Sequence, residues 1–206
     1  MDQPRELSRS AVPLQVTVRH EREVVTYGYL WHASRVTLEL GESGIHGSAW
    51  QYMSSALLTA FSVEAFLNHF GASLFPDWQK MERRKSPMQK LALVAKEVGV
   101  DLGEDSARPM STLVALFDLR NSLAHGRTEN LLPPDIIADA RDDIDRMLVD
   151  GAPRTSWEQK IRTSKFATDA RADVDRILQL LHEAIPEPKD SLYFTGMHMS
   201  SASAIR

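Results

Sequence analysis

The sequence predicts an all-α protein, a helical bundle of four main helices, and three observations support this. Apolar residues recur at intervals of three and four positions in the segments 48–69, 87–98, 105–126 and 163–185, which is the period of a helix face. Glycine or proline follows each segment, as is usual beyond the end of a helix. With 206 residues, of which 43% are hydrophobic, the chain can bury the core of one domain.

The N-terminal region fits this pattern least well. Residues 1–14 are polar and contain two prolines, so we expect a flexible N-terminal arm. Residues 15–40 admit two interpretations, because their valines and aromatic residues favour strands but also fit one face of an amphipathic helix. We favour a helix over about Glu21–Leu40, since the segments that follow are helical. Three glycines between residues 41 and 47 then predict a loop.

Each of the four main helices carries an apolar stripe that we expect in the core. The stripes comprise Leu57, Ala60, Phe61, Ala65 and Leu67 in the first helix, Leu91, Leu93, Val94 and Val98 in the second, Leu113, Leu116, Phe117, Leu123 and Ala124 in the third, and Phe166, Ala170, Val174, Ile177, Leu178 and Leu181 in the fourth. We expect Asp105 or Ser106 to cap the third helix, Pro109 to lie in its first turns, and Gly126 to follow its end.

Further segments complete the predicted organisation. Residues 127–133 predict a loop, and 134–149 predict an extra amphipathic helical segment. We expect one helical domain over residues 15–185. Two prolines end the last helix, and residues 186–206 are predicted to form a loose C-terminal tail.

Composition and missing motifs exclude several classes of protein. The chain has no cysteine, which rules out disulfides, thiolate nucleophiles and cysteine-bound metals. Its seven histidines form no HxH or HxxxH pair, and no Walker A, GxGxxG or GxSxG sequence occurs, so we expect no metal and no cofactor. The formal net charge of −4 argues against a basic nucleic-acid coat. No run of 18 apolar residues and no signal-peptide pattern is present, so we expect a cytoplasmic protein that does not span a membrane.

Two charged residues interrupt the predicted apolar stripes. Arg120 stands where the period of the third helix calls for an apolar side chain, and Glu64 does the same in the first. A buried charge without a partner costs several kcal/mol. We therefore predict a partly buried Glu64–Arg120 ion pair, with Asn68 beside it. The alternative is that Arg120 reaches solvent along the surface and Glu64 is unrelated.

The same helix carries a histidine at its predicted end. His125 lies five positions after Arg120, and Asn121 lies four positions before His125, on the same face. Carbonyl dipoles at a helix C-terminus favour the imidazolium form. An arginine, a histidine and an amide in one cleft suit phosphodiester chemistry, because the arginine stabilises charge on a pentavalent phosphorus and the histidine moves protons.

Residues 120–126, RNSLAHG, resemble the Arg-x(4–6)-His signature of HEPN domains, in which asparagine often follows the arginine. Residues 55–68 resemble the earlier helix of that superfamily, where a glutamate and an asparagine recur. The resemblance spans roughly residues 20–185. It implies an all-α bundle that forms a homodimer, with the two motifs lining one cleft.

The resemblance also implies a function, because many HEPN proteins are metal-independent endoribonucleases of toxin–antitoxin, phage-defence or RNA-processing systems. Carried over to this chain, Arg120 and His125 are the catalytic pair and Asn121 assists them. Glu64 would orient Arg120, and Asn68 would support the pair. Arg127, two residues after His125, would contact the RNA substrate. A neutralising antitoxin or a nucleotidyltransferase is a possible partner.

Three functions remain open at this point. The first is an endoribonuclease, in which the ribose 2′-OH attacks the adjacent phosphate and leaves a 2′,3′-cyclic phosphate. The second is a non-catalytic dimerisation or interaction module, in which the Glu64–Arg120 pair only stabilises the bundle. The third is a nucleotide-binding helical domain.

Overall fold

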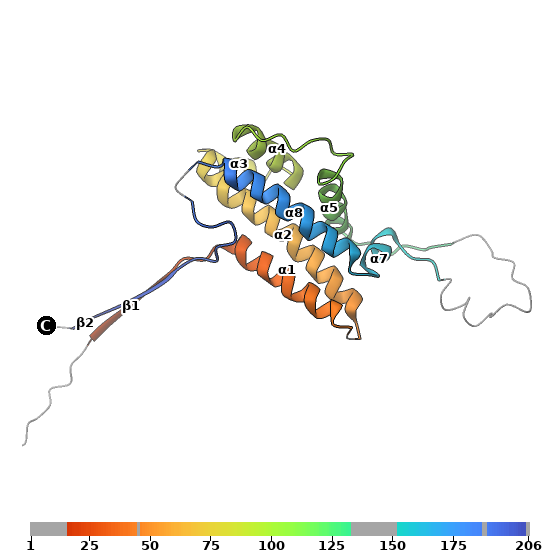
Figure 1. Ribbon diagram of the computed structural model, residues 1–206, viewed down its shortest axis with the longest axis horizontal. Coiled ribbons are helices and arrows are strands. Elements are labelled where there is room, and N and C mark those ends of the chain that lie inside the picture. Colours follow the sequence, from red (N-terminus) through yellow and green to blue (C-terminus); the bar gives the residue numbers. More distant parts are fainter. Residues whose placement is uncertain (1–15, 45, 133–151, 187–188, 205–206) are drawn as a thin grey trace, which may run out of the picture. The chain divides into compact units, whose positions relative to one another are not determined.

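The computed structural model describes residues 16–44, 46–132, 152–186 and 189–204. The described residues form a predominantly helical chain with one two-stranded sheet (Figure 1). The elements are β1 (Val16–Arg22), α1 (Thr26–Glu42), α2 (Ser48–Leu74), α3 (Trp78–Glu82), α4 (Pro87–Glu97), α5 (Met110–Ala124), α7 (Ser156–Ile161), α8 (Lys165–Ala184) and β2 (His198–Ala204). None of these helices combines the length and hydrophobicity that a membrane-spanning segment needs.

The described chain forms two compact units, and the smaller is a β ribbon. Strands β1 and β2 pair antiparallel, with Val16 opposite Ala204 and Arg22 opposite His198. The expected helix over Glu21–Leu40 is therefore wrong at its start, because residues up to Arg22 are extended and α1 begins at Thr26. The strand-favouring valines determine the local structure here, since a pairing strand lies at the other end of the chain.

The larger unit, residues 26–195, is helical, and α2 is its central helix. It contacts α1, α3, α4, α5, α7 and α8, and it runs alongside α1 and α8 (Figure 1). Its core-facing side chains are mostly small, which lets neighbouring helices approach closely. They are Ser55, Ala56, Thr59, Ala60, Ser62 and Val63, followed by the larger Phe66, Leu67 and Phe70. The predicted stripe of α8 is buried at Ala170, Val174, Ile177, Leu178 and Leu181.

Several predicted boundaries differ from the structure. Helix α5 begins at Met110, so neither Asp105 nor Ser106 caps it. The short helices α3 and α7 were not predicted, because five or six residues are too few to show a helical period. The predicted arm over 1–14 and the extra segment over 134–149 lie outside the described residues.

The segment after α8 is held to the helical unit, which differs from the loose tail expected over 186–206. The Tyr193 ring stacks on Trp31, with the ring centroids 4.6 Å apart, and its hydroxyl donates a hydrogen bond to Asp175. Burial and this contact raise the pKa of Tyr193 above its usual range. A Cβ on Gly28 would lie 2.2 Å from the carbonyl oxygen of Phe194, so α1 needs glycine at this close approach.

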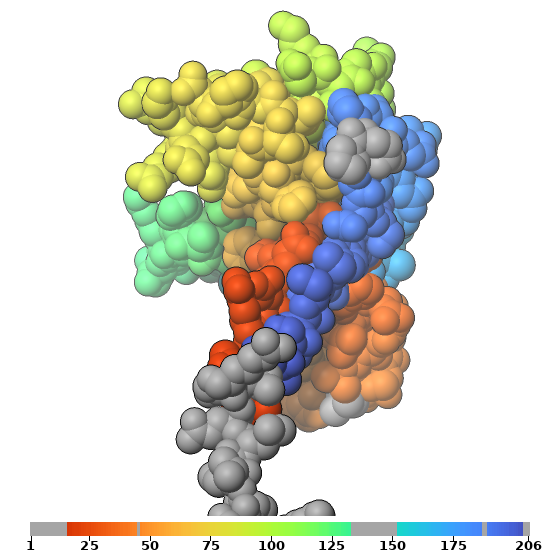
Figure 2. Space-filling model, turned by 90° about the vertical axis from the view of Figure 1, so that its left-hand side faces the viewer, coloured from red at the N-terminus to blue at the C-terminus, as the bar shows by residue number. Residues whose placement is uncertain are grey.

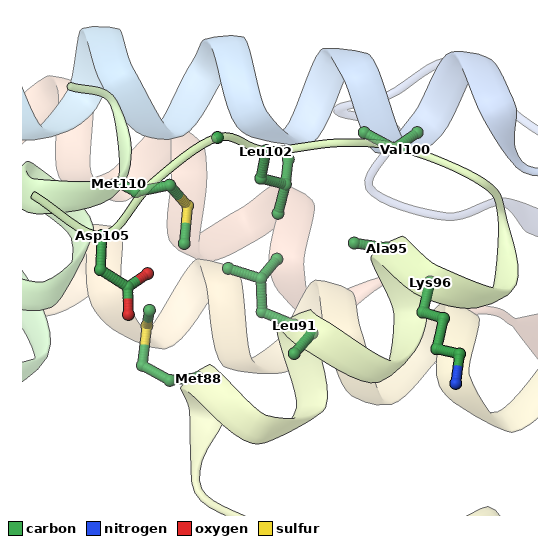
Figure 3. Close-up of a pocket in the computed structure, with 10 residues that line it drawn as sticks. Met88, Leu91, Ala95, Lys96, Val100, Leu102, Asp105 and Met110 are labelled. Atoms are coloured by element: carbon green, nitrogen blue, oxygen red, sulfur yellow. The ribbon is translucent and has the colours of Figure 1, made fainter. Parts of the chain in front are cut away.

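The connection between α4 and α5 folds back over α4 and leaves a hollow of about 320 Å³ (Figure 3). Leu91 and Leu102 face each other across it, and the methionine side chains of Met88 and Met110 approach it from one end. Gly99, with a φ of +72°, permits the turn that starts this return, as the sequence predicts.

Gly71 of α2 offers a direct test of the core packing. A Cβ at this position would lie 2.3 Å from the ring of Trp78, which is 2% exposed. We expect Gly71→Ala to lower the free energy of unfolding by about 1–3 kcal/mol, because the buried ring must move although alanine favours the helix. Urea unfolding followed by circular dichroism measures this change. In the control Gly126→Ala, the nearest atom lies 3.4 Å away, and stability should be unchanged. An equal or higher stability of Gly71→Ala would contradict the packing.

Candidate functional site

Arg120 lies just before the last turn of α5, and His125 is the C-terminal cap of that helix. The helix ends at Ala124, and the backbone amide of His125 donates to the carbonyl of Asn121 across 3.0 Å. His125 itself has φ −114° and ψ 24°, outside the helical range. The described residues that follow, 126–132, contain no helix or strand. The end of α5 thus presents His125 at the edge of the helical unit.

The ion pair predicted between Arg120 and Glu64 is present. Nη2 of Arg120 lies 2.8 Å from Oε1 and 3.1 Å from Oε2 of Glu64, so a single guanidinium nitrogen faces both carboxylate oxygens. The two side chains are 25% and 20% exposed. The pair therefore lies at the margin of the core and contacts solvent.

Further contacts fix the Arg120 guanidinium in the plane that it adopts. Nη1 donates to Oδ1 of Asn121 across 2.9 Å, and the Cζ atom lies 5.9 Å from the centroid of the Phe61 ring. The Nε atom is buried and has no hydrogen-bond partner among the described residues. Two of the five N–H donors are used in these hydrogen bonds, so a donor on each terminal nitrogen can still bind another acceptor.

His125 and Arg127 are exposed. Within the described residues, neither side chain has a hydrogen-bond or ion-pair partner. Figure 2 shows the green segment at the end of α5 on the surface of the face that it views. An imidazole without an internal partner can exchange a proton with a bound ligand.

Asn68 does not join the ion pair as expected. Its Oδ1 accepts a hydrogen bond of 2.9 Å from Nζ of Lys90 on α4, and Lys90 is only 6% exposed. Asn68 lies one helical turn beyond Glu64 on α2, so two neighbouring positions on one helix face each bind a cationic side chain from another helix. The sequence contained a signal for Lys90, which precedes Val94 by four positions and so shares its buried face.

The apolar stripes predicted around this pair are only partly buried. The core contains the predicted Ala60, Leu67, Leu113, Leu116 and Phe117. Phe61 is 39% exposed and Leu57 is partly exposed, because α2 turns its smaller residues towards its neighbours. On α5, Ala124 is exposed, and Leu119, absent from the prediction, is buried. Glu64 and Arg120 therefore do not interrupt the core. They lie on a partly exposed strip of α2 and α5 that also contains the apolar side chains of Leu57 and Phe61.

A double-mutant cycle tests the coupling within the ion pair. Because both groups are partly exposed, we expect Glu64→Leu to cost about 1–3 kcal/mol, less than the loss from a fully buried pair. Adding Arg120→Leu should recover most of that loss, since no unpaired charge then remains. Urea unfolding of both single variants and the double variant measures the coupling. Strictly additive losses would show that the two residues are not coupled.

The described residues contain no group of three or more potential metal ligands. Comparisons with protein-family profiles, curated protein sequences and solved structures found no match to this chain. The function is therefore inferred from the geometry of the candidate site.

Proposed function

We propose that this protein is a metal-independent endoribonuclease of the HEPN type, in which Arg120 and His125 act on an RNA phosphodiester. The observation that carries the proposal is an arginine held in a fixed plane by Glu64 and Asn121, five residues before an exposed histidine at the end of the same helix. A fixed guanidinium with free donors can bind phosphate oxygens, and an imidazole at the end of the same helix can move the protons.

The proposed reaction needs only groups of the RNA and of this chain. The 2′-OH loses its proton to the neutral His125 imidazole and attacks the adjacent phosphorus. Arg120 stabilises the negative charge that develops on the phosphorane oxygens. The bond to the 5′-oxygen then breaks, and that oxygen takes a proton from an imidazolium. The products are a 2′,3′-cyclic phosphate and a 5′-OH.

The proposal includes a homodimer, because one chain offers a single histidine for two proton transfers. A two-fold interface would bring the second His125 and Arg120 to the same cleft. The partly exposed strip supports such an interface, since the Phe61 ring offers apolar surface beside Arg120 and Leu57, one turn earlier on α2, is partly exposed. Arg127 would add a positive charge for the RNA backbone.

A non-catalytic dimerisation module is the second candidate. The observation that favours it is the close approach of both Glu64 carboxylate oxygens to Arg120, which neutralises part of the charge that catalysis would use. In that case the ion pair would only stabilise the bundle.

An RNA cleavage assay in EDTA separates the two candidates. We expect the wild type to cleave end-labelled single-stranded RNA of mixed sequence and to leave 2′,3′-cyclic phosphate ends, which resist phosphatase until acid opens them. His125→Ala should be inactive. His46→Ala, which changes another exposed histidine, should retain full activity. If the wild type cleaves nothing, or if His125→Ala cleaves equally well, the endoribonuclease proposal is wrong.

A further inference from the structure

Two neighbouring hollows beside α7 share two arginines. The smaller hollow, of about 180 Å³, is lined by Trp50 of α2, by Trp157 and Ile161 of α7, and by Arg154 and Arg162. The larger, of about 450 Å³, is lined by the same two arginines together with Pro153 and Gln159. We call the two hollows together the Trp–Arg groove. One side of the groove is thus aromatic and the other is polar.

The aromatic side presents indole rings to solvent. Trp50 is 61% exposed in the first turn of α2, and Trp157 is partly exposed. The other two tryptophans, Trp31 and Trp78, are 7% and 2% exposed and belong to the core. An exposed indole leaves a large planar apolar surface in water, which a stacked planar ligand would cover.

The two arginines of the groove have no ion-pair partner among the residues that the structure describes. No carboxylate within the described ranges lies within ion-pair distance of Arg154 or Arg162. Glu158 also lines the smaller hollow, but its Oε2 accepts hydrogen bonds from the backbone amide and the hydroxyl of Thr155, at 2.7 and 3.0 Å. These bonds direct the carboxylate to the start of α7. Two guanidinium groups along one groove, neither paired with a carboxylate of the described residues, favour an anion that presents several oxygens.

The ends of α7 fix the backbone positions of these two arginines. Thr155 and Glu158 form a reciprocal capping box at its start, and Arg162 lies at its C-terminal cap. Ile161 is 5% exposed and anchors the helix in the core. Arg154 and Arg162 therefore flank a short helix of fixed position, and Trp157 lies between them in the sequence.

We propose that the Trp–Arg groove binds a nucleotide unit, with the base against Trp50 and Trp157 and the phosphate on Arg154 and Arg162. The smaller hollow has room for one aromatic heterocycle, and the polar hollow takes the sugar and phosphate. An aliphatic ligand would leave the arginines unused, and inorganic phosphate would leave the indoles unused. The unit belongs either to single-stranded RNA or to a free mononucleotide. The proposal does not depend on cleavage at His125.

Tryptophan fluorescence tests this directly, because the groove contains Trp50 and Trp157, the two tryptophans that are not buried. The protein for the titrations carries His125→Ala, so that RNA stays intact. We expect saturable quenching by adenosine monophosphate and by a short oligoadenylate. If the protein binds the oligoadenylate much more tightly than adenosine monophosphate, the ligand of the groove is single-stranded RNA. If the two probes bind with equal affinity, the ligand is the mononucleotide. Inorganic phosphate at the same concentrations should not quench the tryptophan fluorescence and should compete only weakly with adenosine monophosphate.

Variants of the groove provide the decisive comparison. We expect Trp50→Ala to weaken nucleotide binding about tenfold, and Trp50→Phe to retain most of it, because phenylalanine still stacks. Arg154→Gln with Arg162→Gln should weaken binding at least about tenfold and reduce its salt dependence. The matched control, Arg83→Gln with Arg84→Gln, removes two exposed arginines elsewhere and should bind adenosine monophosphate normally. Circular dichroism and thermal melts verify the fold of each variant.

Three results would overturn the proposal. In the first, neither nucleotide probe quenches the fluorescence in a saturable way. In the second, the groove variants bind the probes as tightly as the unchanged groove does. In the third, inorganic phosphate displaces the bound oligoadenylate as effectively as adenosine monophosphate does. Loss of RNA cleavage in the separate assay would leave nucleotide binding in the groove unaffected, so the two proposals fail independently.

Discussion

Arg120→Lys is expected to reduce RNA cleavage about 10²–10³-fold, the loss typical when one donor that stabilises a transition-state charge is removed. Lysine keeps the positive charge but loses the planar fork that binds two phosphate oxygens at once. It also cannot reach Glu64 and Asn121 simultaneously with the geometry that Nη2 and Nη1 provide. Single-turnover cleavage of labelled RNA measures the effect on the chemical step.

A matched substitution shows whether the fork or the charge matters. Arg127 is exposed, and its proposed role is a charge contact with the RNA backbone, so Arg127→Lys should cleave at nearly the wild-type rate. Circular dichroism should show the same helicity for both variants. Full activity of Arg120→Lys would show that the planar guanidinium is not needed and would remove this role of Arg120.

Mixing two inactive variants is expected to restore cleavage. If the dimer shares a cleft, an Arg120→Ala/His125→Ala heterodimer keeps the histidine of one chain and the arginine of the other in that cleft. Random exchange makes half of the dimers mixed, so the mixture should cleave RNA faster than either variant alone, but more slowly than the wild type, whose cleft holds two of each residue. The experiment combines equal amounts of the purified variants, allows subunit exchange, and follows RNA cleavage.

One control is each variant alone at the same total concentration. The other is a mixture of two preparations of Arg120→Ala that carry different tags. Both should remain at background. Sedimentation at micromolar concentration should give a dimer for the wild type. A fully active monomer would disprove the shared cleft, and so would a mixture that stays at background although its subunits have exchanged.

The helical elements were predictable where the apolar period is long. Helices α2, α4 and α8 each contain three or more turns of it, and glycine or proline marks their ends. The short helices α3 and α7 contain too few residues for a helical spacing of apolar side chains to be recognised in the sequence. The pairing of β1 with β2 could not be predicted, because a strand without a nearby partner has no local signal that distinguishes it from a short amphipathic helix.

The ion pair was predictable, but its surroundings were not. A charge in each of two apolar stripes was enough to connect Glu64 with Arg120, since an unpaired charge near a core is costly. The exposure of Phe61 was not foreseen, because the spacing of α2 fits two adjacent faces equally well. Small residues decide which face is buried, as Ala56 and Ala60 are completely covered. A sequence pattern assigns a bulky apolar residue such as Phe61 to the core, whereas close helix packing can bury the small residues instead.

The register of β1 and β2 has a consequence during protein synthesis. At roughly 5–20 residues per second, the ribosome adds the ~180 residues between the paired strands in about 10–40 s. During this time the backbone edge of β1 has no partner and could pair with another nascent chain. The charged side chains of Arg19, Glu21 and Arg22 disfavour such pairing. Every residue of β1 is exposed, so the ribbon depends on backbone hydrogen bonds and should close last.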